Sequence, residues 1–409
     1  MNNTFSLKGL TSNKYDYFLI LFIGLLVFGL YGGPLQPIRV VSLALIPFII
    51  ISFFVGKEDP FIRHAYAFCI LLFSFIILSF GWTMDMEEGF KQLFYYFSHL
   101  SLFLLIILFY SKASKPFTSL LKGWVFFIVL TQVIALTEIF FYIHLDVSFL
   151  TTESAVNFYG NGINKSFASV TFGNYNTYVT IITMALPFLF GFLYYKKRLT
   201  QQIFMISIIG ICFYILIVNA SRGGIFAGFI VLFIWFFLTI KRKINHLKEK
   251  LLVFTPILLI VIIKYTQPIF KQITSRLSTG TSLTEDHARL SIFKSALEAF
   301  YKKPFLGGGV GSVKMEMQGA LAVVPHNLFL EFLVEFGMIA TIALVILFLV
   351  VFRGAFQKSF IKKLILISIL ISLPIVTIIN STYLLHPVLW VFIASIYCIS
   401  KFNPEKSHL

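Results

Sequence analysis

Long apolar runs recur along almost the whole chain, from Tyr17 to Trp390. They match the ~20 residues that a helix needs to cross the hydrocarbon core of a membrane, where each backbone amide must be hydrogen-bonded within the protein. Hydrophobic residues make up 58% of the chain and charged residues only 12%, which is more apolar surface than a soluble core can bury. The sequence therefore predicts an all-α, polytopic integral membrane protein.

The runs predict about twelve transmembrane helices in a single transmembrane domain, residues 1–409. Their expected ranges are 16–32, 39–55, 64–82, 92–111, 119–143, 174–195, 201–219, 222–240, 251–264, 327–352, 361–380 and 386–401. Lys8 and Lys14 precede the first run without a small-residue cleavage site, so we expect an uncleaved first helix.

Lysine and arginine are distributed unevenly between the two sides of these helices. With a cytoplasmic N-terminus, the inside segments collect clusters such as Lys196–Arg198 and Lys241–Lys243, while the outside turns hold Arg39, Lys91 and few others. This is the bias of the positive-inside rule, and it predicts that both termini are cytoplasmic. The net charge of +16 then reflects membrane insertion and anionic headgroups, so nucleic acid is not expected as a partner.

Two outside segments, 144–173 and 265–326, are longer than a connection requires. Long polar loops in an economical membrane protein usually carry function, so we expect the chemistry to face outward. The second loop, between the ninth and tenth spans, contains an amphipathic stretch that predicts a helix on the outer membrane surface. Its apolar side chains at helical spacing are Leu290, Phe293, Leu297 and Phe300.

The turn after this helix is rich in glycine and includes Gly309 and Gly311. One interpretation is that backbone amides approach an anionic ligand closely there. The other is that the glycines only end the helix and turn the chain, and the pattern alone favours it.

Arg222 stands at the outer end of an apolar helix, where an unpaired guanidinium group is costly. It either snorkels to the headgroups or faces a ligand. The glycines that follow, Gly223 and Gly224, permit close backbone approach and favour the ligand.

His326 and Asn327 mark the return of the long loop to the membrane, and Glu331 and Glu335 follow one and two helical turns later. Most lone histidines at a helix start are ordinary interfacial residues. Here the imidazole lies near carboxylates that can set its tautomer, an arrangement suited to a general base.

The combination of Ser221–Gly224, Arg289, Pro304–Gly311 and His326–Asn327, followed by Gly337, resembles the O-antigen ligase and O-antigen polymerase family. Order, spacing and topology agree with that family.

An earlier segment, Phe172–Asn176, is similar to the asparagine-bearing segment of the family, so the resemblance covers roughly Phe172 to Ala340. Ala340 departs from the pattern, because the family often has a second glycine there.

The resemblance implies a metal-independent, inverting membrane glycosyltransferase without a cofactor, on the outer face of the bacterial cytoplasmic membrane. The implied donor is a glycan on undecaprenyl diphosphate, the acceptor is a lipid-linked repeat unit or lipid A-core, and a chain-length regulator is a candidate partner. Arg222 and Arg289 would bind the diphosphate, and His326 would take the proton from the acceptor. The candidate substrate-binding residues are Asn174, Asn176, Gly309, Gly311, Asn327 and Glu331. The expected outside loops contain no Asp-rich motif of the kind that binds a metal ion. Asp286 beside Glu285 keeps the question open.

The shared motifs do not separate a polymerase, which extends the glycan, from a ligase, which joins it to lipid A-core. Ser221 and the double glycine beside Arg222 favour the polymerase. A secondary transporter of an anionic substrate is the alternative from another class. It is disfavoured because the long loop between the ninth and tenth helices has no counterpart in the first half of the chain.

Overall fold

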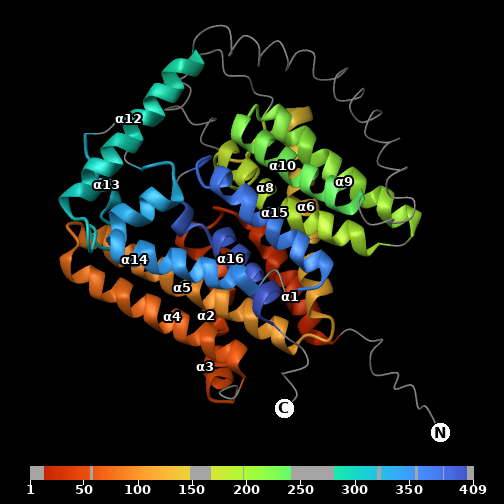
Figure 1. The fold of residues 1–409 in the computed structure, drawn as a ribbon, viewed down its shortest axis with the longest axis horizontal. Helices are drawn as coiled ribbons and strands as arrows, with labels where there is room; N and C mark the ends of the chain where they lie inside the picture. Colours follow the sequence, from red (N-terminus) through yellow and green to blue (C-terminus); the bar gives the residue numbers. More distant parts are fainter. Residues whose placement is uncertain are drawn as a thin grey trace.

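The computed structural model describes residues 13–55, 59–147, 167–196, 198–240, 281–319, 324–354, 358–380 and 382–402. These ranges are helical and contain no strand, so the expected all-α class is confirmed. Figure 1 shows the helices packed into one bundle, with α12 at its edge.

The helices are α1 (Lys14–Gly24), α2 (Pro37–Ala44), α3 (Ile46–Val55), α4 (Pro60–Ser79), α5 (Met86–Lys112), α6 (Pro116–Phe141), α8 (Tyr175–Tyr195), α9 (Leu199–Val218), α10 (Arg222–Ile240), α12 (Thr281–Lys302), α13 (Val313–Glu316), α14 (Leu328–Arg353), α15 (Phe360–Val376) and α16 (Pro387–Lys401). Short 3-10 turns occur at Leu25–Phe28, Gly33–Leu35, Phe80–Trp82 and Tyr383–Leu385.

Helices occupy every expected position except 251–264, which lies outside the described residues. Six described helices are long and apolar enough to cross a membrane, or seven if the bent pair α2 and α3 is one span. α10 and α16 are apolar but shorter. The polytopic membrane class is thus supported, while the total of twelve spans stays a prediction.

The helix starts follow local capping chemistry. The side chains of Asp85, Asn174 and Asn327 accept backbone N–H groups at the starts of α5, α8 and α14, which satisfies donors that have no partner within the helix. Proline occupies the first position of α2, α4, α6 and α16, where its missing N–H costs nothing.

α5 and α8 form the centre of the bundle and are its most deeply buried candidate spans. Large rings fill the space between helices: the indole of Trp124 on α6 stacks on Phe188 of α8, with ring centroids 4.8 Å apart. The indole N–H of Trp124 donates to the Ser395 hydroxyl on α16 at 3.0 Å, so this buried polar group is satisfied.

One end of the bundle, here called the site end, gathers the ends of α4, α6, α9 and α15 and the starts of α2, α5, α8, α10, α14 and α16. We expect it to be the outer end, from the lysine and arginine distribution. In Figure 1, α12 (teal) lies beside the start of α14 and runs at a steep angle to α4, α5 and α14.

Candidate functional site

The connection between α15 and α16, here called the 377–386 segment and described at residues 377–380 and 382–386, organises the site end. The backbone N–H of Leu328, at the start of α14, donates to the carbonyl of Thr377 at 3.1 Å. The backbone N–H of Tyr383 donates to the buried carboxylate of Glu331 at 3.2 Å. The segment is therefore fixed against the first turns of α14, next to His326.

The same segment contacts α8 and α10. The amide of Asn380 donates to the hydroxyl of Thr177 at 2.8 Å, and both residues are buried. A Cβ built on Gly223 would lie 3.1 Å from the side chain of Ile379, so α10 approaches the segment closely beside Arg222. Arg222 and His326, which are far apart in sequence, are thus brought to one segment from two different helices.

Arg222 is the first residue of α10, and its side chain is exposed. His326 precedes α14, is half-buried, and has a φ of 45°. Asn327 caps α14 by accepting the N–H groups of Phe329 at 2.9 Å and Leu330 at 3.2 Å. Its side-chain oxygen therefore fixes the helix start immediately after His326.

Left-handed backbone is concentrated at the site end. Outside glycine, L-residues adopt positive φ rarely and at a cost of roughly 1–2 kcal/mol. Within the described ranges the non-glycine residues with positive φ are Tyr142, Val170, Ala220, His326 and Thr382. All lie in connections at this end, and strained backbone of this kind is typical of functional sites, where the surrounding contacts hold it in place.

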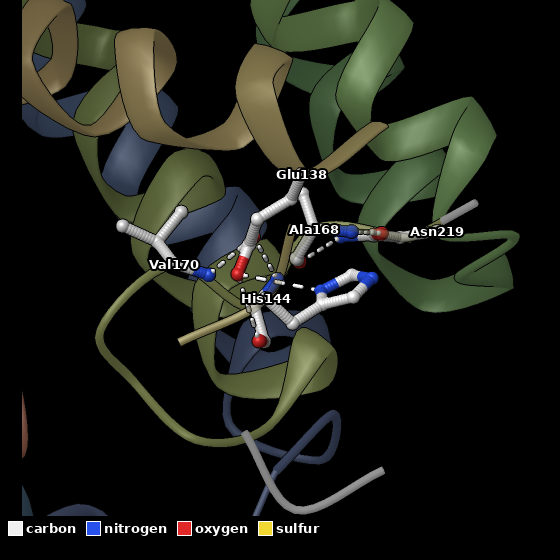
Figure 2. A network of polar contacts seen from close by, with 6 residues as sticks. Glu138, His144, Ala168, Val170 and Asn219 are labelled. Atoms are coloured by element: carbon white, nitrogen blue, oxygen red, sulfur yellow. Dashed lines mark hydrogen bonds and ion pairs between the residues drawn. The ribbon is translucent and has the colours of Figure 1, made fainter. Parts of the chain in front are cut away.

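A buried carboxylate supports one of these residues. Figure 2 shows Glu138, near the end of α6, with its side chain directed at the chain that leads into α8. One carboxylate oxygen accepts the N–H groups of Ser169 at 2.9 Å and Val170 at 2.8 Å. The ring nitrogen Nδ1 of His144 lies 3.5 Å from the other oxygen, and the His144 ring stacks on Phe167 at 4.1 Å.

The same chain segment is tied to the start of α10. Asn219 accepts the N–H of Ala168 at 2.8 Å and donates to its carbonyl at 2.9 Å, as a neighbouring strand would (Figure 2). Asn219 lies three residues before Arg222. The network therefore links the end of α6, the entry to α8 and the position of Arg222.

Asn174 and Asn176 lie half-buried at the start of α8. The side-chain oxygen of Asn174 accepts the N–H of Asn176 at 2.7 Å and caps the helix. Both residues border Thr177, which contacts the 377–386 segment, so the structure places them at the same end as Arg222 and His326.

The glycine-rich turn pairs with a kink in α14. Gly337 has a non-helical φ of 75° inside α14, and a Cβ there would lie 2.4 Å from the carbonyl oxygen of Phe305. The N–H groups of Gly309 and Gly311 donate to the backbone carbonyl and the carboxylate of Glu335, each at 2.9 Å. These two amides thus hold the turn in place, and a role in substrate binding would need other atoms of the turn.

Comparison of the chain with known protein families finds one match. Residues 207–345 match the O-antigen ligase family. The resemblance inferred from the sequence is confirmed over this region, which contains Arg222, α12 and the first part of α14. No curated protein matches the chain.

Arg289 lies in the matched region and on α12, but its side chain is outside the described residues. Its place relative to Arg222 and His326 stays a prediction. Within the described ranges, no group of three His, Cys, Asp or Glu side chains is arranged to hold a metal ion.

Sequence reasoning did not identify a buried arginine at the site end. Arg39, at the start of α2, is 5% exposed, and its guanidinium group lies 4.0 Å from the centre of the Tyr95 ring. It donates to the carbonyls of Gly33 at 3.0 Å and Leu385 at 3.1 Å. Arg39 therefore ties the loop before α2 to the 377–386 segment.

Two glycines have nearly equal φ but different surroundings. Substituting each with alanine therefore distinguishes the cost of steric crowding from the cost of a left-handed backbone. A Cβ on Gly309 (φ 90°) would lie 2.5 Å from the carbonyl oxygen of Ser79, whereas a Cβ on Gly319 (φ 91°) would meet nothing within 4 Å. We expect Gly319→Ala to cost only about 1–2 kcal/mol for its left-handed backbone. Gly309→Ala should lower the unfolding temperature in detergent much further, and equal shifts for both would contradict the packing of the turn.

The Glu138 network predicts a stability effect. Glu138→Ala leaves the N–H groups of Ser169 and Val170 without their acceptor, at roughly 1–3 kcal/mol for each buried group. Glu138→Gln keeps one acceptor oxygen and should lose less. Thermal unfolding measures the difference, with Thr137→Ala as the control on the preceding, partly exposed position of α6. Unfolding temperatures equal to the control would show that the network contributes nothing.

Proposed function

We propose that this protein transfers a glycan from undecaprenyl diphosphate to a sugar hydroxyl on the outer face of the bacterial cytoplasmic membrane. The observation that carries the proposal is that the starts of α10 and α14, which carry Arg222 and follow His326, both contact the 377–386 segment. Both residues lie in the region that matches the O-antigen ligase family. The imidazole of His326 and the guanidinium group of Arg222 lie at the same end of a membrane bundle. This suits a lipid-linked diphosphate, whose phosphates lie at the headgroup level.

The reaction is a displacement at the anomeric carbon of the donor. The imidazole of His326 accepts the proton of the acceptor hydroxyl, and the oxygen forms the new glycosidic bond with inversion. The bond between the anomeric carbon and the diphosphate breaks, and the electron pair leaves with the phosphate oxygen. Arg222 and Arg289 stabilise the charge on the departing diphosphate, which replaces the usual function of a metal ion.

The surrounding contacts act by positioning these groups. Asn327 fixes the start of α14 directly after His326, and Glu331 holds the 377–386 segment through the N–H of Tyr383. We therefore assign Glu331 to positioning rather than to direct contact with substrate. Asn174 and Asn176 lie just before Thr177, which contacts the same segment, and are the remaining candidates for binding the glycan.

We favour a polymerase of surface polysaccharide over a ligase. The choice rests on the sequence pattern alone, Ser221 and the double glycine beside Arg222. In the structure these glycines serve packing: a Cβ on Gly224 would lie 2.1 Å from the side chain of Val179 on α8.

A gel assay separates the alternatives. The gene is expressed in a host whose own polymerase or ligase has been deleted and whose glycan pathway is otherwise intact, and the surface glycan is resolved by length. A restored ladder of increasing length supports a polymerase. Rescue limited to the attachment of preformed chains selects the ligase. No effect on the glycan in either host would favour the secondary transporter.

A further inference from the structure

The glycine-rich turn between α12 and α13 descends along α14 rather than staying outside the bundle. The N–H groups of Met338 and Ile339 donate to the carbonyls of Pro304 at 2.8 Å and Phe305 at 3.4 Å. The N–H of Gly308 donates to the carbonyl of Val334 at 2.9 Å. The turn therefore enters deepest at Pro304 and Phe305 and returns toward the helix start at Gly308.

The membrane boundary on α14 can be estimated from its length. α14 has 26 residues and ends at Arg353, a basic residue expected at the inner surface. A core about 30 Å thick takes up about 20 residues of helix, which puts the opposite boundary close to Val334. Ile339 lies further in, beyond the non-helical Gly337, so Phe305, whose carbonyl accepts the N–H of Ile339, lies below this boundary.

A neighbouring helix gives the same level independently. The N–H of Val310 donates to the hydroxyl of Ser79, the last residue of α4, at 3.1 Å, and the hydroxyl of Thr83 donates to the carbonyl of Val310 at 2.8 Å. Val310 follows Gly309, whose N–H donates to the carbonyl of Glu335. Glu335 therefore lies level with the end of α4, and Phe305, which pairs with Ile339 beyond the break at Gly337, lies deeper than this level.

The side chains at this depth are apolar and point away from the protein. Phe305 is 60% exposed and Leu306 is 46% exposed, next to Ile339 at 55%. In water, such a cluster would be costly at about 25 cal/mol per Å² of apolar surface. At this depth, the acyl chains of the lipid cover it.

α12 continues the same surface. Its buried face, Ile292, Ala296 and Ala299, packs against Val334 of α14. On the opposite face Leu290, Leu297 and Tyr301 are exposed, together with Lys294 and Glu298. Apolar side chains, a tyrosine and charged groups on one free face suit the membrane interface.

We infer that Phe305 and Leu306 form a wedge inserted into the acyl chains of the leaflet at the site end, and that the wedge and the free face of α12 hold this helix on the membrane surface. The partner is the bilayer itself. The wedge converts part of the expected outside loop, 265–326, into a membrane-embedded element.

Single-cysteine spin labelling of the full chain in lipid nanodiscs tests the wedge. The native cysteines, Cys69, Cys212 and Cys398, are all buried, so a thiol-specific nitroxide reports on the introduced residue. The test variant is Leu306→Cys. Its references are Ile346→Cys, seven residues before the end of α14 and 55% exposed, and Gln318→Cys, exposed after α13. The labels are attached in detergent before reconstitution, and wild type serves as the unlabelled control.

The measurement is the collision rate of each label with oxygen, which concentrates in lipid, and with a nickel chelate, which stays in water. We expect oxygen to exceed the chelate at positions 306 and 346 and the reverse at position 318. Access of the chelate to position 306 equal to that at position 318 would overturn the wedge. Protection of position 306 from both probes would also overturn it, because a protein partner such as a second copy would then cover the site.

Discussion

Replacing His326 with alanine is expected to lower glycan transfer by about 10²- to 10⁴-fold, the usual contribution of a general base. The half-buried imidazole lies beside the first turn of α14, so its loss should leave the fold and the membrane abundance unchanged. The measurement is the length distribution of the surface glycan in the deletion host, with protein abundance determined by immunoblot.

His64→Ala is the matched control for that change. His64 is exposed on α4 near the opposite end of the bundle, so its replacement should retain wild-type transfer. Wild-type glycan length from His326→Ala at equal abundance would remove this histidine from the mechanism.

The second large effect is expected from Arg222. Arg222→Ala removes the guanidinium group that we propose to stabilise the departing diphosphate, and the loss of one such group typically lowers the rate about 10²- to 10³-fold. Arg222→Lys keeps the charge without the planar pair of donors, so we expect activity between alanine and wild type. Transfer measured at saturating and limiting donor separates binding from catalysis.

Arg353→Ala supplies the comparison, because Arg353 is an exposed arginine at the last position of α14, away from the site end. A fall in transfer from Arg353→Ala equal to that from Arg222→Ala would show that general loss of positive charge, rather than position, explains the effect.

Much of the fold is predictable from local sequence. Apolar runs fix the helices because lipid leaves the backbone no other way to satisfy its amides, and residues such as Asn174 and Asn327 mark helix starts by capping. The weakest expectations concern helix ends, where α1 stops at Gly24 and continues as a 3-10 turn.

The organisation of the site is less accessible to sequence reasoning. The 377–386 segment carries no motif, and its importance arises from contacts with Leu328, Glu331 and Thr177, which are distant in the chain. No local pattern encodes such pairings. An arginine at the outer start of an apolar run was the available signal for Arg39, yet its burial depends on Tyr95 and Leu385.

The glycine-rich turn is a motif that the sequence reveals without revealing its function. Its spacing predicts close backbone approach, which the structure has at Gly309 and Gly337. The groups that approach are protein carbonyls and the carboxylate of Glu335 rather than a ligand. Sequence alone does not say what the glycines approach.

The most direct measurement is transfer by the purified, reconstituted protein. Undecaprenyl-diphosphate-linked glycan is supplied in vesicles containing EDTA, and released undecaprenyl diphosphate and lengthened glycan are quantified together. The account predicts that wild type releases one undecaprenyl diphosphate for each new glycosidic bond, and that His326→Ala and Arg222→Ala give almost none of either product. Absence of both products from wild type with a competent donor, or wild-type yields from both variants, would contradict it.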